Sequence, residues 1–114
     1  MKKYIVIYHA PEELMAQSAN ASPEDMDKGM EDWMKWAAKC GDQLIDLGNP
    51  LMGGQKLSPD GNSQSSTRGV AGYSILQAAD MDDVKSLLIG HPHLAWNAAC
   101  EIEVHEVMPL QGSE

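Results

Sequence analysis

Residues 3 to 9 read Lys-Tyr-Ile-Val-Ile-Tyr-His. Their β-branched and aromatic side chains occupy both alternating faces, a pattern that predicts a β-strand. A strand that is apolar on both faces is buried on both faces. We therefore expect this strand in the middle of a sheet, with structure packed on each side of it.

Two helices are predicted from the signals at their ends. Ser22 is a good N-cap residue followed by Pro23 and two acids, and Gly41 is a helix stop. Apolar residues between them recur at steps of three and four, as in an amphipathic helix. Asp80 caps a second helix, which Gly90 should end.

The remaining chain divides into further strands and their connections. Strands are expected at 44–47, 70–77 and 101–108, with a bent or bulged edge region at 51–57 and a turn-rich loop at 58–69. The connection at 10–21 has room for one short turn of helix, 91–100 is expected to be irregular, and 109–114 is expected to be a frayed tail. This order is that of a ferredoxin-like split βαβ fold, an α+β class with an antiparallel sheet and two helices on one face. Because two helices cover only one face, we expect a homodimer formed through the other sheet face.

Length and composition limit the classes of protein. The 114 residues predict a single domain spanning 1–114, and eight Met without any Phe lead us to expect Met side chains throughout the core. A formal net charge of −9 argues against nucleic acid and anionic membranes as partners. The absence of a long apolar run and the presence of only two Cys favour a cytoplasmic protein.

Several short motifs, in their order and spacing, resemble the YCII-related family of small dimeric α+β barrel proteins, which includes a DGPF-type subgroup. They are Met-Lys-Lys-Tyr-Ile-Val-Ile-Tyr at 1–8, Trp33-Met-Lys-Trp36, Leu44-Ile-Asp-Leu-Gly48, Gly-Tyr-Ser-Ile-Leu-Gln-Ala at 72–78, His91-Pro92, and Ile102-Glu-Val104 ahead of Pro109. Asp60 and Gly61 lack the Pro-Phe that would complete the subgroup motif. The resemblance implies a dimeric barrel and small-molecule chemistry, including a dehydrochlorinase type, with a suspected His–Asp pair as active site.

Three residues are candidates for catalysis. His9 ends the first strand, where a side chain can reach a cleft, and an imidazole titrates near working pH. His91 follows the second helix, where a cation is favoured without any catalytic role. Asp46 alternates with apolar neighbours, so it points either to solvent or into a pocket, where it could orient a histidine.

Three further residues are candidates for substrate binding: Trp36 on the first helix, Tyr73 on the strand at 70–77, and His93 beside His91. Trp36 lies off the main apolar stripe, whereas Trp33 fits the core. His91 and His93 supply only two nitrogens, which do not make a zinc site, so we expect no metal and no other cofactor.

These observations favour a homodimer with a small pocket in each subunit that performs cofactor-free acid–base chemistry on a small organic molecule, as an isomerase or a lyase of the dehydrochlorinase type. An alternative is a non-catalytic module that binds a ligand or a protein. A cofactor-free monooxygenase of similar shape is a third possibility, because one fold supports many activities.

Overall fold

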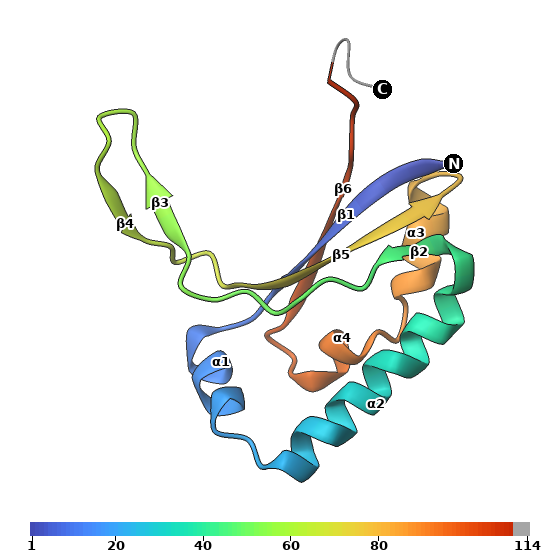
Figure 1. The fold of residues 1–114 in the computed structure, drawn as a ribbon, viewed down its shortest axis with the longest axis horizontal. Helices are drawn as coiled ribbons and strands as arrows, with labels where there is room; N and C mark the ends of the chain where they lie inside the picture. The colour runs from blue at the N-terminus through green and yellow to red at the C-terminus, as the bar shows by residue number, and fades with distance from the viewer. Residues whose placement is uncertain (111–114) are drawn as a thin grey trace.

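The computed structural model describes residues 1–110, apart from the side chains of residues 18 and 19. Its main sheet has four antiparallel strands in the order β2-β5-β1-β6 (Figure 1). These strands are β1 (Lys2–His9), β2 (Leu44–Asp46), β5 (Val70–Ala78) and β6 (Glu101–Glu106). The sequence-based prediction that the first strand is central is confirmed, since β1 pairs with β5 on one side and β6 on the other.

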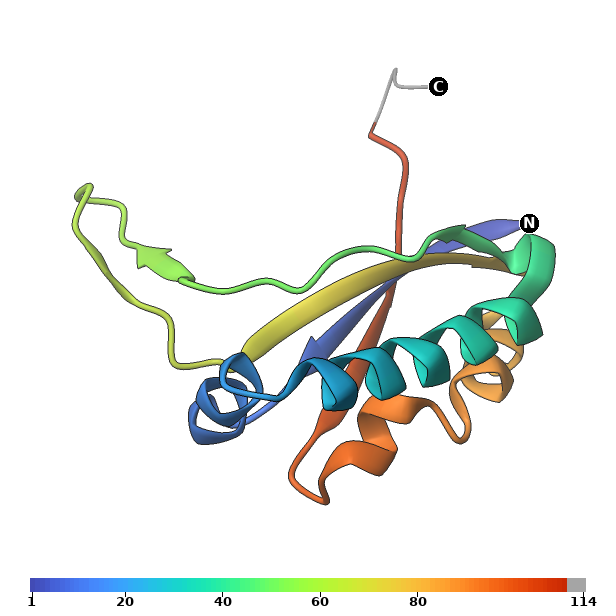
Figure 2. The same ribbon diagram turned by 60° about the horizontal axis from the view of Figure 1, so that its bottom comes forward.

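The helices lie on one face of the sheet (Figure 2). They are α1 (Glu12–Ala19), α2 (Pro23–Cys40), α3 (Met81–Leu88) and α4 (Pro92–Trp96), with a 3-10 turn at Gly41–Gln43. The predicted caps form: Ser22 accepts a hydrogen bond from the Asp25 N–H, and Asp80 accepts one from the Asp83 N–H. Gly41 ends α2 with φ +56°, a value that L side chains rarely adopt.

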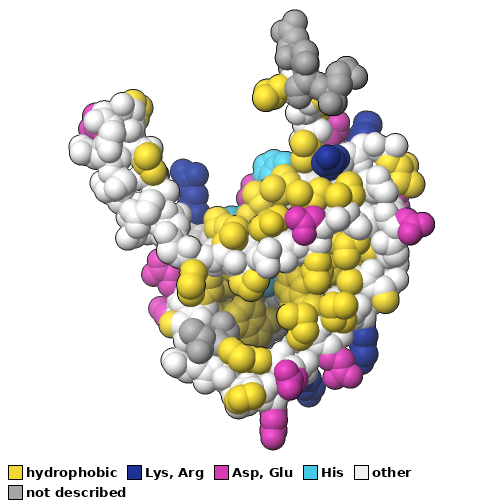
Figure 3. Space-filling model, viewed as in Figure 1, with side chains coloured by type: hydrophobic (Ala, Val, Ile, Leu, Met, Phe, Trp, Pro, Cys, Tyr) yellow, Lys and Arg dark blue, Asp and Glu magenta, His cyan; other side chains and the backbone are white. Residues whose placement is uncertain are grey.

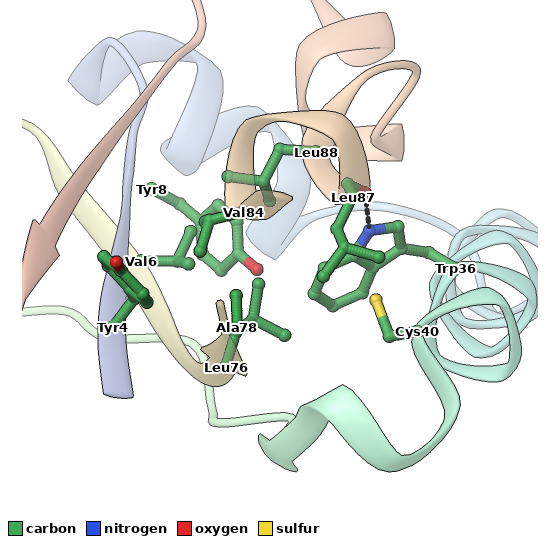
Figure 4. Close-up of a cluster of buried hydrophobic side chains, with 10 residues drawn as sticks. All are labelled: Tyr4, Val6, Tyr8, Trp36, Cys40, Leu76, Ala78, Val84, Leu87 and Leu88. Atoms are coloured by element: carbon green, nitrogen blue, oxygen red, sulfur yellow. Dashed lines mark hydrogen bonds between the residues drawn. The ribbon is translucent and has the colours of Figure 1, made fainter. Parts of the chain in front are cut away.

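Alternation along β1 divides its side chains between the two faces of the sheet. Tyr4, Val6 and Tyr8 are buried beneath the helices, in a core shared with Leu76 of β5 and Leu88 of α3 (Figure 4). The other face carries the half-buried residues Ile5, Ile7 and His9 of β1 together with Tyr73 and Ile75 of β5. We call this second side the open face, because no helix lies on it (Figure 2).

The core is not built from methionine, contrary to the expectation from composition. Met26, Met30 and Met34 on α2 are 53–58% exposed, and the buried hydrophobic side chains of the described residues are Tyr, Val, Leu, Ala, Trp and Cys. The reason lies in how α2 packs. Only its C-terminal part, with Trp36 and Cys40, is buried against the sheet.

Three segments contain more regular structure than expected. The connection at 10–21 contains α1, the segment at 91–100 contains α4, and the loop at 58–69 contains one strand of a hairpin made by β3 (Gln55–Leu57) and β4 (Ser63–Ser65). The described residues contain the two predicted helices, α2 and α3, and two more, of which α1 lies where one short turn of helix was expected. The last strand ends at Glu106 rather than at 108. Residues 109 and 110 have no regular structure, and the rest of the expected tail lies outside the described residues.

Candidate functional site

A chain of buried polar groups lies between the sheet and the helices. Tyr8 of β1 and Ser74 of β5 share the covered face, and their hydroxyl oxygens are 2.7 Å apart. The Tyr8 hydroxyl also lies 3.3 Å from Nε2 of His91, the residue that caps α4. Ser74 donates to the Leu47 carbonyl at 2.6 Å. Tyr8, Ser74 and His91, which are far apart in the sequence, therefore meet at one buried site.

The donor-to-acceptor direction of this hydrogen-bond chain follows from the partners at its two ends. The His93 backbone N–H donates to Nδ1 of His91 at 2.9 Å, so the proton of the neutral ring is on Nε2. Nε2–H then donates to Tyr8, Tyr8 donates to Ser74, and Ser74 donates to the Leu47 carbonyl. Each hydroxyl both accepts and donates, which polarises its neighbours in the chain.

Burial keeps the groups of this chain uncharged at neutral pH. Desolvation, with the nearby His93 ring as a second cause, lowers the pKa of His91 to about 3. Desolvation also raises the pKa of Tyr8 above its ordinary value, against a smaller opposite effect of its hydrogen bond to Ser74. The pKa of His93 is lowered for the same main reason. The site therefore offers neutral hydrogen-bonding groups rather than ions.

Aromatic rings surround His91. The ring centroids of Trp36 and Trp33 lie 4.4 and 4.6 Å from that of His91, and Trp33 also contacts Tyr8 edge-on at 4.9 Å. Trp36 is buried and its indole N–H donates to the Leu87 carbonyl at 2.8 Å. Trp33 is only partly buried, so it is the member of this cluster that reaches the surface.

The surface is hollowed between α1, α2 and the sheet, and hydrophobic side chains line the hollow (Figure 3). A separate cavity of about 340 Å³ lies between α2 and the segment that joins α3 to α4, and its lining includes Lys35, Trp36, Lys39 and Pro92. The predicted substrate-binding residue Trp36 thus has its N–H committed to the core while it borders this cavity.

The side chain of His9 does not join His91, because it lies on the open face. Its Nδ1 is 2.8 Å from the Arg68 carbonyl and its Nε2 is 3.0 Å from Glu103, whose other oxygen is 3.1 Å from His105. These hydrogen bonds from the two imidazoles hold the pKa of Glu103 below its usual range. His9 also borders a cavity of about 250 Å³.

The backbone of His9 connects the two faces, since its carbonyl accepts a hydrogen bond from Nε2 of His93 at 2.8 Å. His93 therefore serves the buried chain through its backbone N–H, while its ring anchors α4 to the end of β1. The predicted role of His93 in substrate binding stays a prediction, and its ring Nε2 is hydrogen-bonded to the β1 backbone.

Asp46 and Tyr73 lie together, apart from His91. Asp46 Oδ1 accepts the Gly48 N–H at 2.8 Å, and the Tyr73 hydroxyl is 3.5 Å from Asp46 Oδ2. The structure thus brings His91 and His93 together with Trp36, and leaves His9 and the Asp46–Tyr73 pair elsewhere. Roles for these residues in catalysis or binding stay predictions.

Sequence reasoning missed Tyr8, Ser74 and Trp33 as site residues. Alternation did indicate that Tyr8 and Ser74 each point to one face of a sheet, but not that these faces coincide opposite His91. Among residues 1–110, no group of three or more His, Cys, Asp or Glu side chains is arranged to hold a metal ion. Among the same residues, no helix has the length and apolar character needed to cross a membrane.

Comparison with known proteins gives a fold-level match and a family. One solved structure, 5-chloro-2-hydroxyhydroquinone dehydrochlorinase from Burkholderia phenoliruptrix AC1100 in complex with 2,5-dihydroxybenzoquinone, is similar over 100% of both chains, with a TM-score of 0.56 and 14% identity. No curated protein sequence matches the chain. The model of the YCII-related domain matches residues 1–108. The chain therefore belongs to the YCII-related family.

Proposed function

We propose that the protein is an enzyme that processes a small organic molecule by acid–base chemistry of the isomerase or lyase type. The reacting centre is the Tyr8–His91 pair beside Trp33. The observation that carries this proposal is the buried chain of neutral donors with one fixed direction, which runs from His91 through Tyr8 to Ser74. A solely apolar core would need no such chain.

The chemical value of this arrangement lies in stabilising negative charge on a ligand oxygen. When a hydroxylated substrate loses a proton, charge develops on its oxygen, and fixed donors in a dry site stabilise that charge strongly. A ligand oxygen that replaces Ser74 as the acceptor would accept a hydrogen bond from the Tyr8 hydroxyl. The Nε2–H of His91 simultaneously donates to Tyr8, which makes the phenol a stronger donor.

The substrate class that fits best is a flat, uncharged or weakly acidic ring with hydroxyl groups. Trp33 offers a partly exposed aromatic surface to such a ring, and the net charge of −9 disfavours multiply anionic substrates. The fold-level neighbour is named for dehydrochlorination of a chlorinated hydroxyhydroquinone. In such a compound one hydroxyl proton moves to the chlorine-bearing ring carbon, and loss of chloride together with a second hydroxyl proton leaves a quinone. The chloride and that proton leave to solvent, so no other reactant is needed.

The same proposal includes a homodimer formed through the open face, in the cytoplasm. Ile5, Ile7 and Ile75 form an apolar patch there that no helix covers. Packing against the same patch of a second copy would bury this surface with two-fold symmetry. The two cysteines are free thiols, which favours a reducing compartment.

One observation favours a second candidate function, a non-catalytic ligand-binding module. The chain of donors ends at the Leu47 carbonyl, which accepts a hydrogen bond but does not pass a proton onward. In that case the chain positions Tyr8 for recognition of a ligand and supports no turnover.

The test is turnover of a panel of chlorinated and unchlorinated hydroxyhydroquinones, followed by chloride release and quinone absorbance. Loss of one preorganised donor costs roughly 10²–10³ in rate, so Tyr8→Phe should reduce kcat by about that factor. Tyr73→Phe is the matched control. This proposal gives the Tyr73 hydroxyl, which lies near Asp46 on the other face of the same sheet, no contact with the substrate, so kcat should stay within about twofold of the wild type.

Equal rates for Tyr8→Phe and the wild type would reject Tyr8 as part of the reacting centre. Saturable binding that depends on Tyr8 but gives no turnover with any compound would favour the binding module over the enzyme. Conversion with uptake of oxygen would instead support the monooxygenase reading.

A further inference from the structure

A hairpin arm extends from the body of the protein. The arm, defined as residues 51–66, contains β3 and β4 and projects away from the sheet and the helices (Figures 1 and 2). β3 and β4 pair only with each other, and every residue of both strands is exposed. The arm therefore has no core of its own within the described chain.

Such an arm is poorly stabilised by its own contacts. Each strand has three residues, and an isolated two-stranded hairpin is marginally stable at best in water. At its base, Leu51 N–H donates to the Ala71 carbonyl at 2.9 Å, and Ser66 N–H donates to the Gly54 carbonyl at 2.9 Å. These bonds fix where the arm begins, and at its tip the Ser58 N–H donates to the Asn62 carbonyl at 2.8 Å, so hydrogen bonds without apolar burial hold the arm.

The arm exposes large apolar side chains. Met52 is 87% exposed and Leu57 is 72% exposed. Helices lie on one side of the sheet, whereas the arm extends past the other side (Figure 2). A molecule that covers the open face would therefore also meet the arm.

We infer that the arm packs against a second copy of this chain and clasps it. Two-fold symmetry makes each copy both donor and receiver of an arm, so one apolar surface covers the other without a different partner. The arm also adds no net charge, because Lys56 offsets Asp60, so it can approach a second acidic copy without adding to the repulsion.

This inference rests on the dimer through the open face, and it assigns the arm a specific part in that dimer. The side chain of Leu57 provides an apolar anchor that is buried only in the assembly. The arm, rather than the sheet faces alone, then sets the dissociation constant of the dimer.

Sedimentation equilibrium over a range of protein concentrations tests the inference with two matched variants. Leu57→Asp changes a residue of the arm, and Ile89→Asp changes a residue at the end of α3 that is equally exposed, at 72%. We expect Leu57→Asp to weaken the dimer at least tenfold, and Ile89→Asp to leave its dissociation constant within about twofold.

A shortened arm provides a second test that does not depend on one side chain. Gly54 and Ser66 are hydrogen-bonded, so an Asn-Gly turn can replace Gln55–Ser65 and close the hairpin there. This variant should keep the far-UV circular dichroism of the body and lose most of the dimer. Undiminished dimerisation of both arm variants would overturn the clasp while leaving the sheet-face dimer in place. A wild type that stays monomeric would overturn both, and turnover by that monomer would leave the proposed reaction standing.

Discussion

Replacement of Tyr8 by Phe removes one oxygen from the buried chain and leaves the aromatic ring in place. Ser74 keeps its own hydrogen bond to the Leu47 carbonyl. The Nε2–H of His91 loses its acceptor, and His91 is fully buried, so water cannot replace that acceptor. An unsatisfied buried donor costs about 1–3 kcal/mol, so the free energy of unfolding should fall by about that amount.

Urea unfolding followed by tryptophan fluorescence measures this loss, since Trp33 and Trp36 lie beside His91. The protein concentration must be held constant, because dimerisation would add to the apparent stability. Tyr73→Phe is the control: within the part of the chain that the structure describes, its hydroxyl is hydrogen-bonded to Asp46 alone, at 3.5 Å near the surface, so the change should lie within about 0.5 kcal/mol. Equal stability of the two variants would refute the assignment of Tyr8 as the acceptor for His91.

Three other predictions follow from the geometry. Because the pKa of His91 is about 3 in the folded state and near 6.5 in the unfolded chain, the unfolded state binds more protons between these values. The free energy of unfolding should therefore fall as pH drops from about 6.5 toward 3, and His91→Gln should flatten that dependence in urea titrations. Gly48→Ala should cost more than about 2 kcal/mol, because a Cβ at φ +81° would collide with the Tyr73 carbonyl, whereas Gly61→Ala, at φ +89° in open space, should cost only the strain of that backbone conformation. Gly29→Ala should raise the melting temperature, by the ~0.5–1 kcal/mol that separates Ala from Gly inside a helix, since nothing lies within 4 Å of the added Cβ.

The elements that sequence predicted well are those whose signals are local. β1 was predictable because both of its alternating faces are apolar. α2 and α3 were predictable because each has a capping side chain before its first turn and a glycine near its C-terminal end. α1 is as long as α3 but lacks a comparable apolar stripe, and α4 has only five residues. The hairpin of β3 and β4 is too polar to be distinguished from a loop.

The candidate site depends on contacts that are not local, which explains why it was only partly predicted. Tyr8 is separated from Ser74 by 66 positions and from His91 by 83, and no local pattern states which strands pair or where α4 packs. His91 was a candidate only because it is a histidine beside a helix end. The structure adds that its ring is buried and that the His93 N–H fixes its tautomer. Likewise, the periodicity of α2 indicated an apolar side that includes Met26, Met30 and Met34, without showing that these side chains are exposed.

The most direct test of the proposed centre is an NMR titration of isotope-labelled protein with 2,5-dihydroxybenzoquinone and related hydroxylated rings. The account predicts that the ring signals of His91 and the indole signal of Trp33 shift together and saturate, and that Tyr8→Phe weakens this binding at least tenfold while Tyr73→Phe does not. Shifts confined to His9 and its open-face neighbours, with His91 and Trp33 unmoved by every compound, would contradict it.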